Sequence, residues 1–509
     1  MNGTLAERPV VVLVAAASVL LSLAIGMWAM RRTRDARDFF IAGQRLGLVV
    51  TGLATTSAAF SGFVFLGGPG LTYRIGVASL WIVVPVGFTA ALMCWVVAGP
   101  LRRLSGAGDV LTIPDVIACR FAGRAPRGCA AIAVLFGTTG YLGSQLLALG
   151  IVLSGLVPAG GDERQHLAVA IALGAAIVLA YSVAGGMVAG AYTDVLQGVI
   201  MVVAAASVFA SAIASAGGIT ELGQTIAASP RFGAAFLEPF GTIPAVTALG
   251  FLFVFGVGPL GQPHVLHKFY MLRDPAQLKW MPLVIGSSQS LCLLVWIGVG
   301  LAVPALVASG KLMPLEDPDR ALPAFVLGHA SDLLAGLVLA GVLAAIMSTA
   351  DSFVNIGSAA LVRDLPRSFG LAPRRELLWG RIAAVAVTLA AGALAVAYDD
   401  LVALLGTFAF GTFAAALAPS LAVGLNWKGA TPAAATASIV TGLSLNLGLE
   451  LAVSGAGPSW LPDRPIVAGA LPSAVALAAS FLVLIVVGML TAGRDEDSLD
   501  REVASWLDA

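Results

Sequence analysis

Long apolar runs recur along this chain, and they constrain its fold more than any other feature. Thirteen runs are long enough to cross the roughly 30 Å hydrocarbon core of a bilayer as helices. Only 11% of the 509 residues are charged, against about 25% in a soluble domain. We therefore expect an all-α integral membrane protein whose main solvent is the lipid bilayer. The predicted spans are residues 9–30, 46–71, 78–100, 126–157, 165–184, 188–216, 243–264, 280–309, 327–362, 378–397, 400–425, 430–453 and 467–492.

The basic residues predict how these spans are oriented. Short cytoplasmic loops carry an excess of Lys and Arg. With thirteen spans and the N-terminus outside, 21 of the 28 basic residues fall in inside connections. We therefore predict an N-out, C-in topology, with residues 494–509 forming a cytoplasmic acidic tail. The seven basic residues on the outside are Arg8, Arg74, Arg164, Arg231, Lys311, Arg320 and Arg464.

Several function classes are disfavoured by composition. The net charge is zero, which argues against a nucleic-acid partner. The four cysteines are widely spaced and predict neither a metal cluster nor a redox pair. The chain contains no HExxH, no GxSxG and no paired histidine cluster, so we expect neither an enzyme nor an organic cofactor.

Glycine and proline interrupt two of the spans at matching places. One interruption is SAAFSG at 57–62, followed by GGPG at 67–70, and the other is FGVGPLGQP at 255–263. Paired interrupted helices in corresponding halves of a transporter point to its binding site. The spacing predicts a five-plus-five inverted repeat, although glycine and proline also occur in ordinary membrane helices. The predicted divisions are 1–45 (an extra span and loop), 46–426 (the core, with repeats 46–216 and 243–426), 427–493 (two extra spans) and the tail.

One apolar run, LAAIMSTADSFVN at 343–355, carries a cluster of polar side chains. Ser348, Thr349, Asp351 and Ser352 fall within five residues. A single hydroxyl in a membrane helix can bond to the carbonyl one turn back, but an ionisable residue there costs about 2.5–3.5 kcal/mol. This cluster is therefore a candidate functional site.

The oxygen atoms of this cluster favour a monovalent cation. The hydroxyls of Ser348 and Thr349 and the carbonyl of Ala345 supply three neutral oxygens, and interrupted backbone near Ser57 and Phe60 can supply two more. Hard cations bind oxygen ligands, and a neutral cage holds Na⁺ better than Ca²⁺ or Mg²⁺. The sequence therefore predicts half of a sodium site late in the chain and half in the first interrupted span.

Four ordered motifs resemble those of the sodium:solute symporter family. They are DFFIAGQRLG (38–47), YSVAGGMVAGAYTDVLQGVIM (181–201), GQPHVLHKF (261–269) and LAAIMSTADS (343–352). The resemblance covers about residues 35–430 and is strongest to the sodium/proline branch. It implies a LeuT-type fold, Na⁺-coupled symport of a small organic solute, a monomeric functional unit and a multi-pass location in the bacterial inner membrane.

The resemblance also assigns roles to individual residues. The implied Na⁺ ligands are carbonyls of Ser57, Phe60 and Ala345 and hydroxyls of Ser348 and Thr349. Asp194 resembles an acid behind this site, although a helix cap is the alternative, and Asp351 and Ser352 match an additional sodium site in sialic acid transporters. The implied solute pocket contains Ser61, Gly62, Phe63, Tyr141, Phe255, Pro259, Gln262, Pro263 and His264.

This chain departs from the sodium/proline branch at three of these pocket positions and at Ala59, two residues before Ser61. Ala59 replaces an acid, Phe63 and Phe255 replace tryptophans, and Pro259 replaces a tyrosine. The pocket is therefore more apolar, which leaves proline, another amino acid and a small carboxylate open as the solute. Two other functions also remain open. One is a proton-coupled carrier in which Asp194 or Asp351 takes the proton, and the other is a transporter-like membrane sensor.

Overall fold

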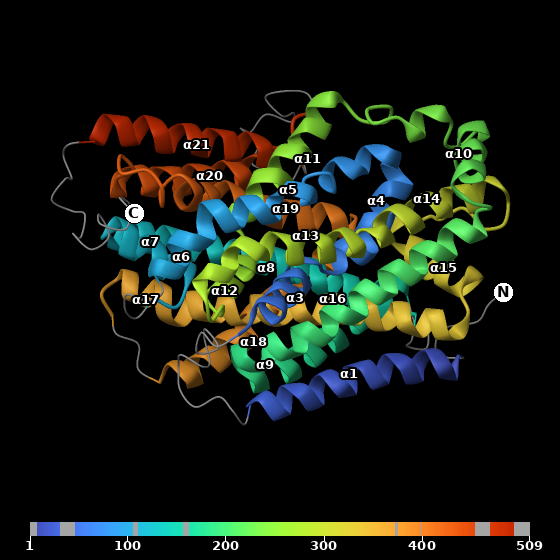
Figure 1. Ribbon diagram of the computed structural model, residues 1–509, viewed down its shortest axis with the longest axis horizontal. Helices are drawn as coiled ribbons and strands as arrows, with labels where there is room; N and C mark the ends of the chain where they lie inside the picture. The colour runs from blue at the N-terminus through green and yellow to red at the C-terminus, as the bar shows by residue number, and fades with distance from the viewer. Residues whose placement is uncertain are drawn as a thin grey trace.

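The computed structural model is an all-helical bundle in the part of the chain that it describes, which is residues 8–30, 46–104, 110–155, 162–371, 375–398, 400–453 and 469–492. Most helices run along the long axis of the molecule (Figure 1). Among the described residues, β structure is limited to one isolated parallel bridge between Leu46 and Leu272. Most of the motif at 38–47 and the predicted tail at 494–509 lie outside the described residues.

The first half of the chain contains the elements up to the long helix α9 and the loop after it. They are α1 (Pro9–Met30), α3 (Leu48–Ala59), η3 (Phe63–Gly67), α4 (Gly68–Ile75), η4 (Gly76–Ile82), α5 (Val86–Met93), η5 (Cys94–Ala98), α6 (Gly99–Leu104), α7 (Ile113–Phe121), α8 (Arg124–Ser154), α9 (Glu163–Ser215), α10 (Ile219–Ala228) and η6 (Ala234–Leu237).

The second half begins with the other interrupted span. Its elements are α11 (Ala245–Val257), η7 (Gly258–Gly261), α12 (Pro263–Phe269), η8 (Pro275–Trp280), α13 (Met281–Cys292), α14 (Leu294–Ala308), η9 (Pro318–Arg320), α15 (Ala321–His329), α16 (Asp332–Ala359), η10 (Ala360–Asp364), α17 (Leu365–Ser368), α18 (Glu376–Ala397), α19 (Val402–Ala422), α20 (Pro432–Val453) and α21 (Pro472–Thr491).

Ten of the described helices are long and apolar enough to cross a membrane, or twelve if two bent pairs each count as one span. The bent pairs are Leu48–Ala59 with Phe63–Ile82, at 57°, and Ala245–Gly261 with Pro263–Phe269, at 48°. These twelve correspond to twelve of the thirteen predicted runs. The remaining run, 78–100, is broken, because a 3-10 segment ends at Ile82 and a new helix begins only after Pro85.

Helix α9 contains two crossings in one continuous helical element. Its N-terminal Glu163 pairs with Arg320 at 2.6 Å. Shortly after its C-terminus, Phe232 packs on Tyr73, whose hydroxyl accepts a hydrogen bond from Leu315 N, close to Arg320 in the chain. Both ends of α9 therefore lie at the same end of the bundle. The two candidate spans within it, Glu163–Ala180 and Gly190–Ser215, correspond to the two spans predicted on either side of residues 184–188.

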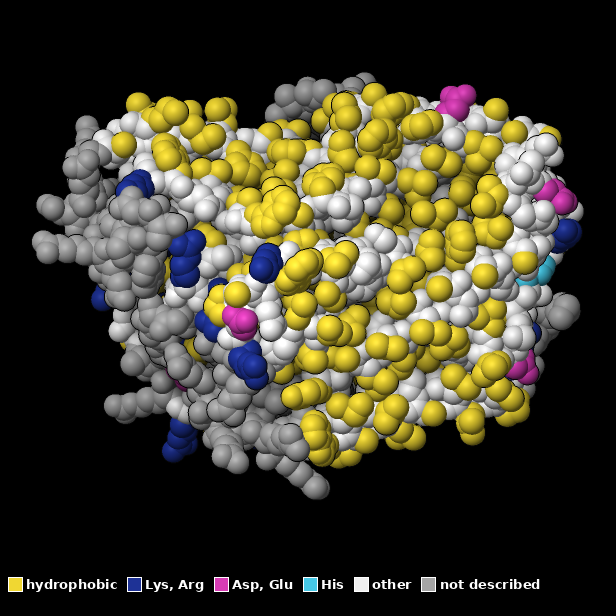
Figure 2. Space-filling view, in the orientation of Figure 1, with side chains coloured by type: hydrophobic (Ala, Val, Ile, Leu, Met, Phe, Trp, Pro, Cys, Tyr) yellow, Lys and Arg dark blue, Asp and Glu magenta, His cyan; other side chains and the backbone are white. Residues whose placement is uncertain are grey.

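The surface separates into an apolar middle and two charged ends. Hydrophobic side chains cover most of the face in Figure 2, while the Lys and Arg side chains gather toward the left, where Figure 1 places α6, α7 and α12. At the opposite end, Arg8 pairs with Asp332, Arg74 with Asp400 and Arg320 with Glu163. An apolar belt between polar ends is what a bilayer requires of a spanning protein.

Three helices form the centre of the bundle. The most apolar stretches of α8, α16 and α19 are 78%, 78% and 83% buried, whereas those of α1, α20 and α21 are only 22–28% buried. The polar cluster of α16 therefore faces protein and not lipid. A binding site can form in such a buried place.

Candidate functional site

The first interruption frees backbone carbonyls in the centre of the bundle. Helix α3 ends at Ala59, Phe60 is extended with φ −102° and ψ 122°, and helical geometry resumes at Gly62. Carbonyls in the last turn of a helix have no partner within that helix. Gly62, at the start of the next helical segment, packs too closely for a side chain, because a Cβ there would lie 2.7 Å from the Cβ of Ala148.

The second interruption lies in the corresponding span of the other half. The 3-10 turn η7 ends at Gly261, and Gln262 is extended with φ −85° and ψ 102° before α12 begins. Pro263 occupies the first helical position, where its missing N–H costs nothing. Gly261 allows close packing, because a Cβ there would lie 2.7 Å from the backbone nitrogen of Ala418 in α19.

The hydroxyls of α16 meet the freed carbonyls of α3. Ser348 Oγ donates to Ser57 O at 2.9 Å and lies 3.1 Å from Ala345 O. Thr349 Oγ1 lies 3.2 Å from Ala58 O and 3.5 Å from Phe60 O. The structure thus brings together all five predicted sodium ligands and adds the carbonyl of Ala58, which sequence reasoning missed.

This cluster fits a small monovalent cation. Its side chains are fully buried, and its donors are two hydroxyls and four backbone carbonyls, all neutral oxygens. Hydroxyl protons that now point at carbonyls can rotate away, which turns both partners toward one ion. Neutral oxygen ligands suit a hard ion of low charge.

Asp194, by contrast, is already paired. It lies inside α9, not at a helix end, and its Oδ2 is 2.7 Å from Lys268 Nζ of α12. Lys268 is one of the 21 basic residues assigned to inside connections, and that assignment is wrong for it, since it lies in α12 and its side chain is only 1% exposed. His264, which the resemblance assigns to the solute pocket, and His267 are buried as well. The cause is the second interruption, which turns α12 back into the bundle.

Asp351 and Ser352 lie in α16, on the C-terminal side of the predicted sodium ligands Ser348 and Thr349. Both are buried, and Asn355 Nδ2 donates to the Asp351 carbonyl. The Asp351 carboxylate faces α9, because a Cβ on Gly190 would lie 3.0 Å from its Oδ2. Asp351 therefore belongs to the layer of Asp194 and not to that of Ser348.

A small cavity of about 80 Å³ lies between the two interruptions. Its lining includes Phe63, Tyr141, Phe255, Pro259, Gln262 and His264 of the predicted pocket, whereas Ser61, Gly62 and Pro263 do not line it. Gln262 Oε1 and His264 Nδ1 are buried without a hydrogen-bond partner among the described residues. Unpaired buried polar atoms in an otherwise apolar cavity are the groups a polar solute would satisfy.

Ser61 and Gly62 make hydrogen bonds that hold the backbone of the break in place. Ser61 Oγ lies 3.4 Å from Tyr141 OH and accepts from Phe63 N. Gly62 N donates to Gln145 Oε1 at 2.9 Å. Sequence reasoning missed Gln145, although a buried amide in an apolar run was a usable signal.

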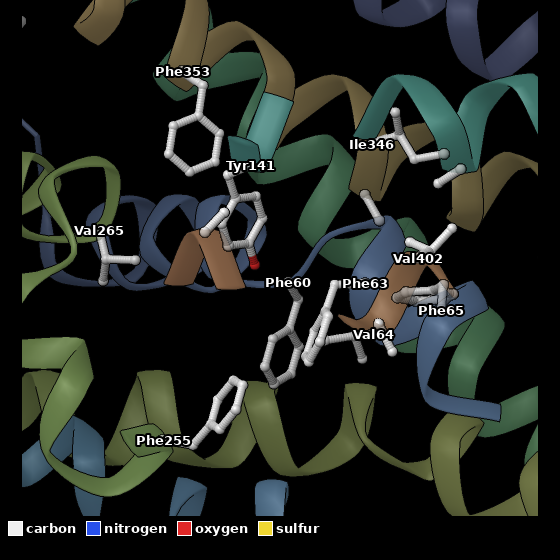
Figure 3. Packing of buried hydrophobic residues seen from close by; sticks show 14 of the residues in the cluster. Phe60, Phe63, Val64, Phe65, Tyr141, Phe255, Val265, Ile346, Phe353 and Val402 are labelled. Carbon is white, nitrogen blue, oxygen red and sulfur yellow. The ribbon is translucent and has the colours of Figure 1, made fainter. Parts of the chain in front are cut away.

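Stacked aromatic rings close one side of the cavity. The ring of Phe63 stacks on Phe255 at 5.7 Å between centroids, and Phe255 stacks on Phe410 at 4.5 Å. Figure 3 shows the rings of Phe60 and Phe63 facing that of Phe255, with Tyr141 nearby. Phe410 and Trp296 also line the cavity and were not predicted. The stack joins α11 to both η3 and α19.

Sequence comparison decides the family. The sodium:solute symporter family matches residues 39–442. This chain belongs to that family. The symporter is 30% identical to the high-affinity proline transporter PutP of Bacillus subtilis over 82% of this chain and 88% of that protein. It is 27% identical to a sodium/proline symporter of Haemophilus influenzae over 94% of both chains.

The solved structures agree on the fold. A Na⁺-coupled sialic acid symporter in a substrate-bound outward-open state matches with a TM-score of 0.72 at 16% identity, covering 95% of this chain and 98% of that one. MhsT in complex with L-phenylalanine matches with a TM-score of 0.54 at 13% identity, covering 87% of this chain and 98% of that one. The fold is of the LeuT type, and the protein is a multi-pass plasma-membrane symporter that couples Na⁺ to a solute.

Proposed function

We propose that Na⁺ binds between Ser348 and Thr349 of α16 and the carbonyls of Ser57, Phe60 and Ala345, with Ala58 as a further ligand. The observation that carries this proposal is the 2.9 Å contact from Ser348 Oγ to Ser57 O. It joins two segments 291 residues apart at the point where the helix is broken. An ion there stabilises one arrangement of the break, and the break forms one wall of the solute cavity.

The proposed solute is a small amino acid, with proline as the first candidate. Relatives at 27–30% identity are proline transporters by name. The cavity offers Tyr141, Gln262 and His264 to a charged or polar head, and Phe63 and Phe255 to an apolar body. Phenylalanines in place of indoles, with Ala59 and Pro259, make the cavity more apolar than the proline branch pattern, so other small amino acids and small carboxylates belong in the same assay.

The two interruptions support a cycle of alternating access. Na⁺ enters from outside and ties α3 to α16, which orders the cavity and raises solute affinity. The coupling is reciprocal, so solute also raises Na⁺ affinity. Parting of the stack of Phe63, Phe255 and Phe410 opens the cavity to one side, and rearrangement of α12 opens it to the other.

One ion per cycle is energetically sufficient. A tenfold Na⁺ gradient contributes about 1.4 kcal/mol, and one charge crossing about 100 mV contributes about 2.3 kcal/mol. The sum sustains a solute gradient of roughly a few hundred-fold.

The proposed topology has thirteen spans with the N-terminus outside. Residues 46–216 and 243–426 form the inverted repeats, residues 1–45 and 427–493 add spans outside them, and residues 494–509 end the chain in the cytoplasm. The matching places of the two bent pairs support the repeat. The end that carries Arg8, Arg74 and Arg320 is then the outer one. The functional unit is one chain and works without an organic cofactor.

Uptake into proteoliposomes tests the function. Radiolabelled proline should accumulate under an inward Na⁺ gradient and fail to accumulate when choline replaces Na⁺ at fixed pH. The double variant S348A/T349A should lose Na⁺-dependent uptake, whereas S358A should keep it, since the Ser358 hydroxyl donates to the Val354 carbonyl of its own helix. Full Na⁺ stimulation in the double variant would contradict the site. Uptake driven equally by a proton gradient would favour the proton-coupled alternative, and competition by other amino or carboxylic acids would reassign the solute.

A further inference from the structure

Lys268 and Asp194 form a buried ion pair that the proposed transport cycle does not use. The Nζ–Oδ2 distance is 2.7 Å, and the two side chains are 1% and 3% exposed. Isolated buried charges are strongly disfavoured, so each of these groups requires a partner of opposite sign. The pair joins α12, the inner half of the second interrupted span, to α9.

The pair lies one layer away from the proposed Na⁺ ligands. Seven residues beyond Asp194 on α9, Met201 Sδ accepts a hydrogen bond from Ser57 Oγ at 3.8 Å. Seven helical residues span about 10 Å. On α16, Asp351 follows Thr349 by two residues and faces Gly190, which is one turn before Asp194. Asp194 and Asp351 therefore form an acidic layer next to the proposed Na⁺ site, and Lys268 enters this layer as the partner of Asp194.

A second Na⁺ would need an acidic layer in this place. The negative charge of this layer, however, is already balanced in part by Lys268. The ammonium of Lys268 donates a hydrogen bond to Asp194 Oδ2 at 2.7 Å. Two cations within a few ångströms of each other in a buried site repel strongly. The residues present therefore do not fit a second Na⁺ at Asp194 while Lys268 occupies it.

We propose that Lys268 is a built-in counter-ion that takes the place of a second Na⁺ at Asp194, so that this symporter couples one Na⁺ to each solute. A tethered ammonium supplies the same charge as Na⁺ but cannot leave, so it adds nothing to the driving force. Lys268 is thus the residue that sets the ion stoichiometry. This inference rests on the Na⁺ site proposed above at Ser348 and Thr349.

Direct counting of bound ions tests the inference without any knowledge of the solute. Purified full-length protein in detergent is titrated to saturation with ²²Na⁺. Wild type should bind a single ion. K268Q should bind a second ion at the released Asp194, and K268Q/D194N should return to one. K268R, which keeps the charge, and K279Q, which removes an exposed charge beside Trp280, should both stay at one.

The same titrations separate this inference from the proposed Na⁺ site. S348A/T349A should bind no ion, and K268Q in that background should bind one. If S348A/T349A keeps its ion but K268Q still gains one, the Na⁺ site is wrong and the role of Lys268 stands. Two ions in wild type, or one in a folded K268Q, would overturn the role of Lys268. If K268Q does not elute as a monodisperse protein, the wild-type count and that of K268R decide.

Discussion

Ser348 of α16 donates a hydrogen bond to the carbonyl of Ser57 in α3 across 2.9 Å, and neither residue is exposed. The acceptor is available because α3 ends two residues later, at Ala59. A hydroxyl and a freed carbonyl at this distance can turn to a shared ion. In the proposed cycle, solute and ion act on the same broken helix, and this arrangement gives a physical basis for their coupling.

Single substitutions at the two hydroxyls should weaken Na⁺ binding in steps. S348A and T349A each remove one oxygen ligand, and loss of a buried polar partner costs about 1–3 kcal/mol, or roughly 5- to 150-fold in affinity. The half-saturating Na⁺ concentration for uptake measures this loss. S358A is the matched control in the same helix, and an equal shift in that variant would mean that the effect is not local.

Phe255→Trp should change solute preference more than Na⁺ affinity. The ring of Phe255 stacks between Phe63 and Phe410 at the edge of the cavity, so a larger ring reshapes the solute space. The relative potencies with which a panel of amino acids inhibits labelled proline uptake should change several-fold. A pocket role for Phe255 is refuted if only the Na⁺ half-saturation moves.

Gln145 should hold the start of the second half-helix in place. Its Oε1 accepts from Gly62 N, and Gln145→Leu leaves that buried N–H unpaired at a cost of about 1–3 kcal/mol. We expect a lower melting temperature and weaker Na⁺ binding in Q145L. Gln145→Glu keeps an acceptor oxygen and should restore part of both. Equal behaviour of the two variants would argue against the hydrogen bond as the cause.

Asp319, in the loop before α15, should make stability depend on pH. Burial raises the pKa of this carboxyl to about 7, even though Val402 N donates to its Oδ2. The folded state then binds more protons than the unfolded state, which titrates near pH 4, so stability is greatest at low pH and falls as pH rises toward 7. Asp319→Asn removes this charge and should be more stable at pH 8 by roughly 1–3 kcal/mol.

Thermal unfolding at a series of pH values checks this prediction. The melting temperature of wild type should decline between about pH 4 and pH 7 more steeply than that of Asp319→Asn. Asp317 and Asp400 raise the pKa of Asp319 and Arg74 lowers it, so Asp400→Asn serves as the comparison for a neighbouring charge. Parallel pH profiles for wild type and Asp319→Asn would assign the dependence to other groups.

The sequence by itself determined the solvent, the class of fold and the residues of the candidate oxygen cluster other than Ala58. Apolar runs of span length require helices in lipid, and the glycine and proline clusters mark two broken spans in matching places. The hydroxyls at Ser348 and Thr349 stand out because polar groups in a buried membrane helix need a partner. These signals lie within short stretches of sequence, so they can be read without knowing how the helices pack.

Only the tertiary structure decided which polar groups meet. Lys268 looked like a loop residue, since charge and position along the chain do not show that α12 turns back into the bundle to reach Asp194. Gln145 reaches Gly62 from 83 residues away, and Ala58 joins the oxygen cluster only through the rotation of α3 against α16. Contacts between distant segments depend on helix packing and bend angles, which no short stretch of sequence encodes.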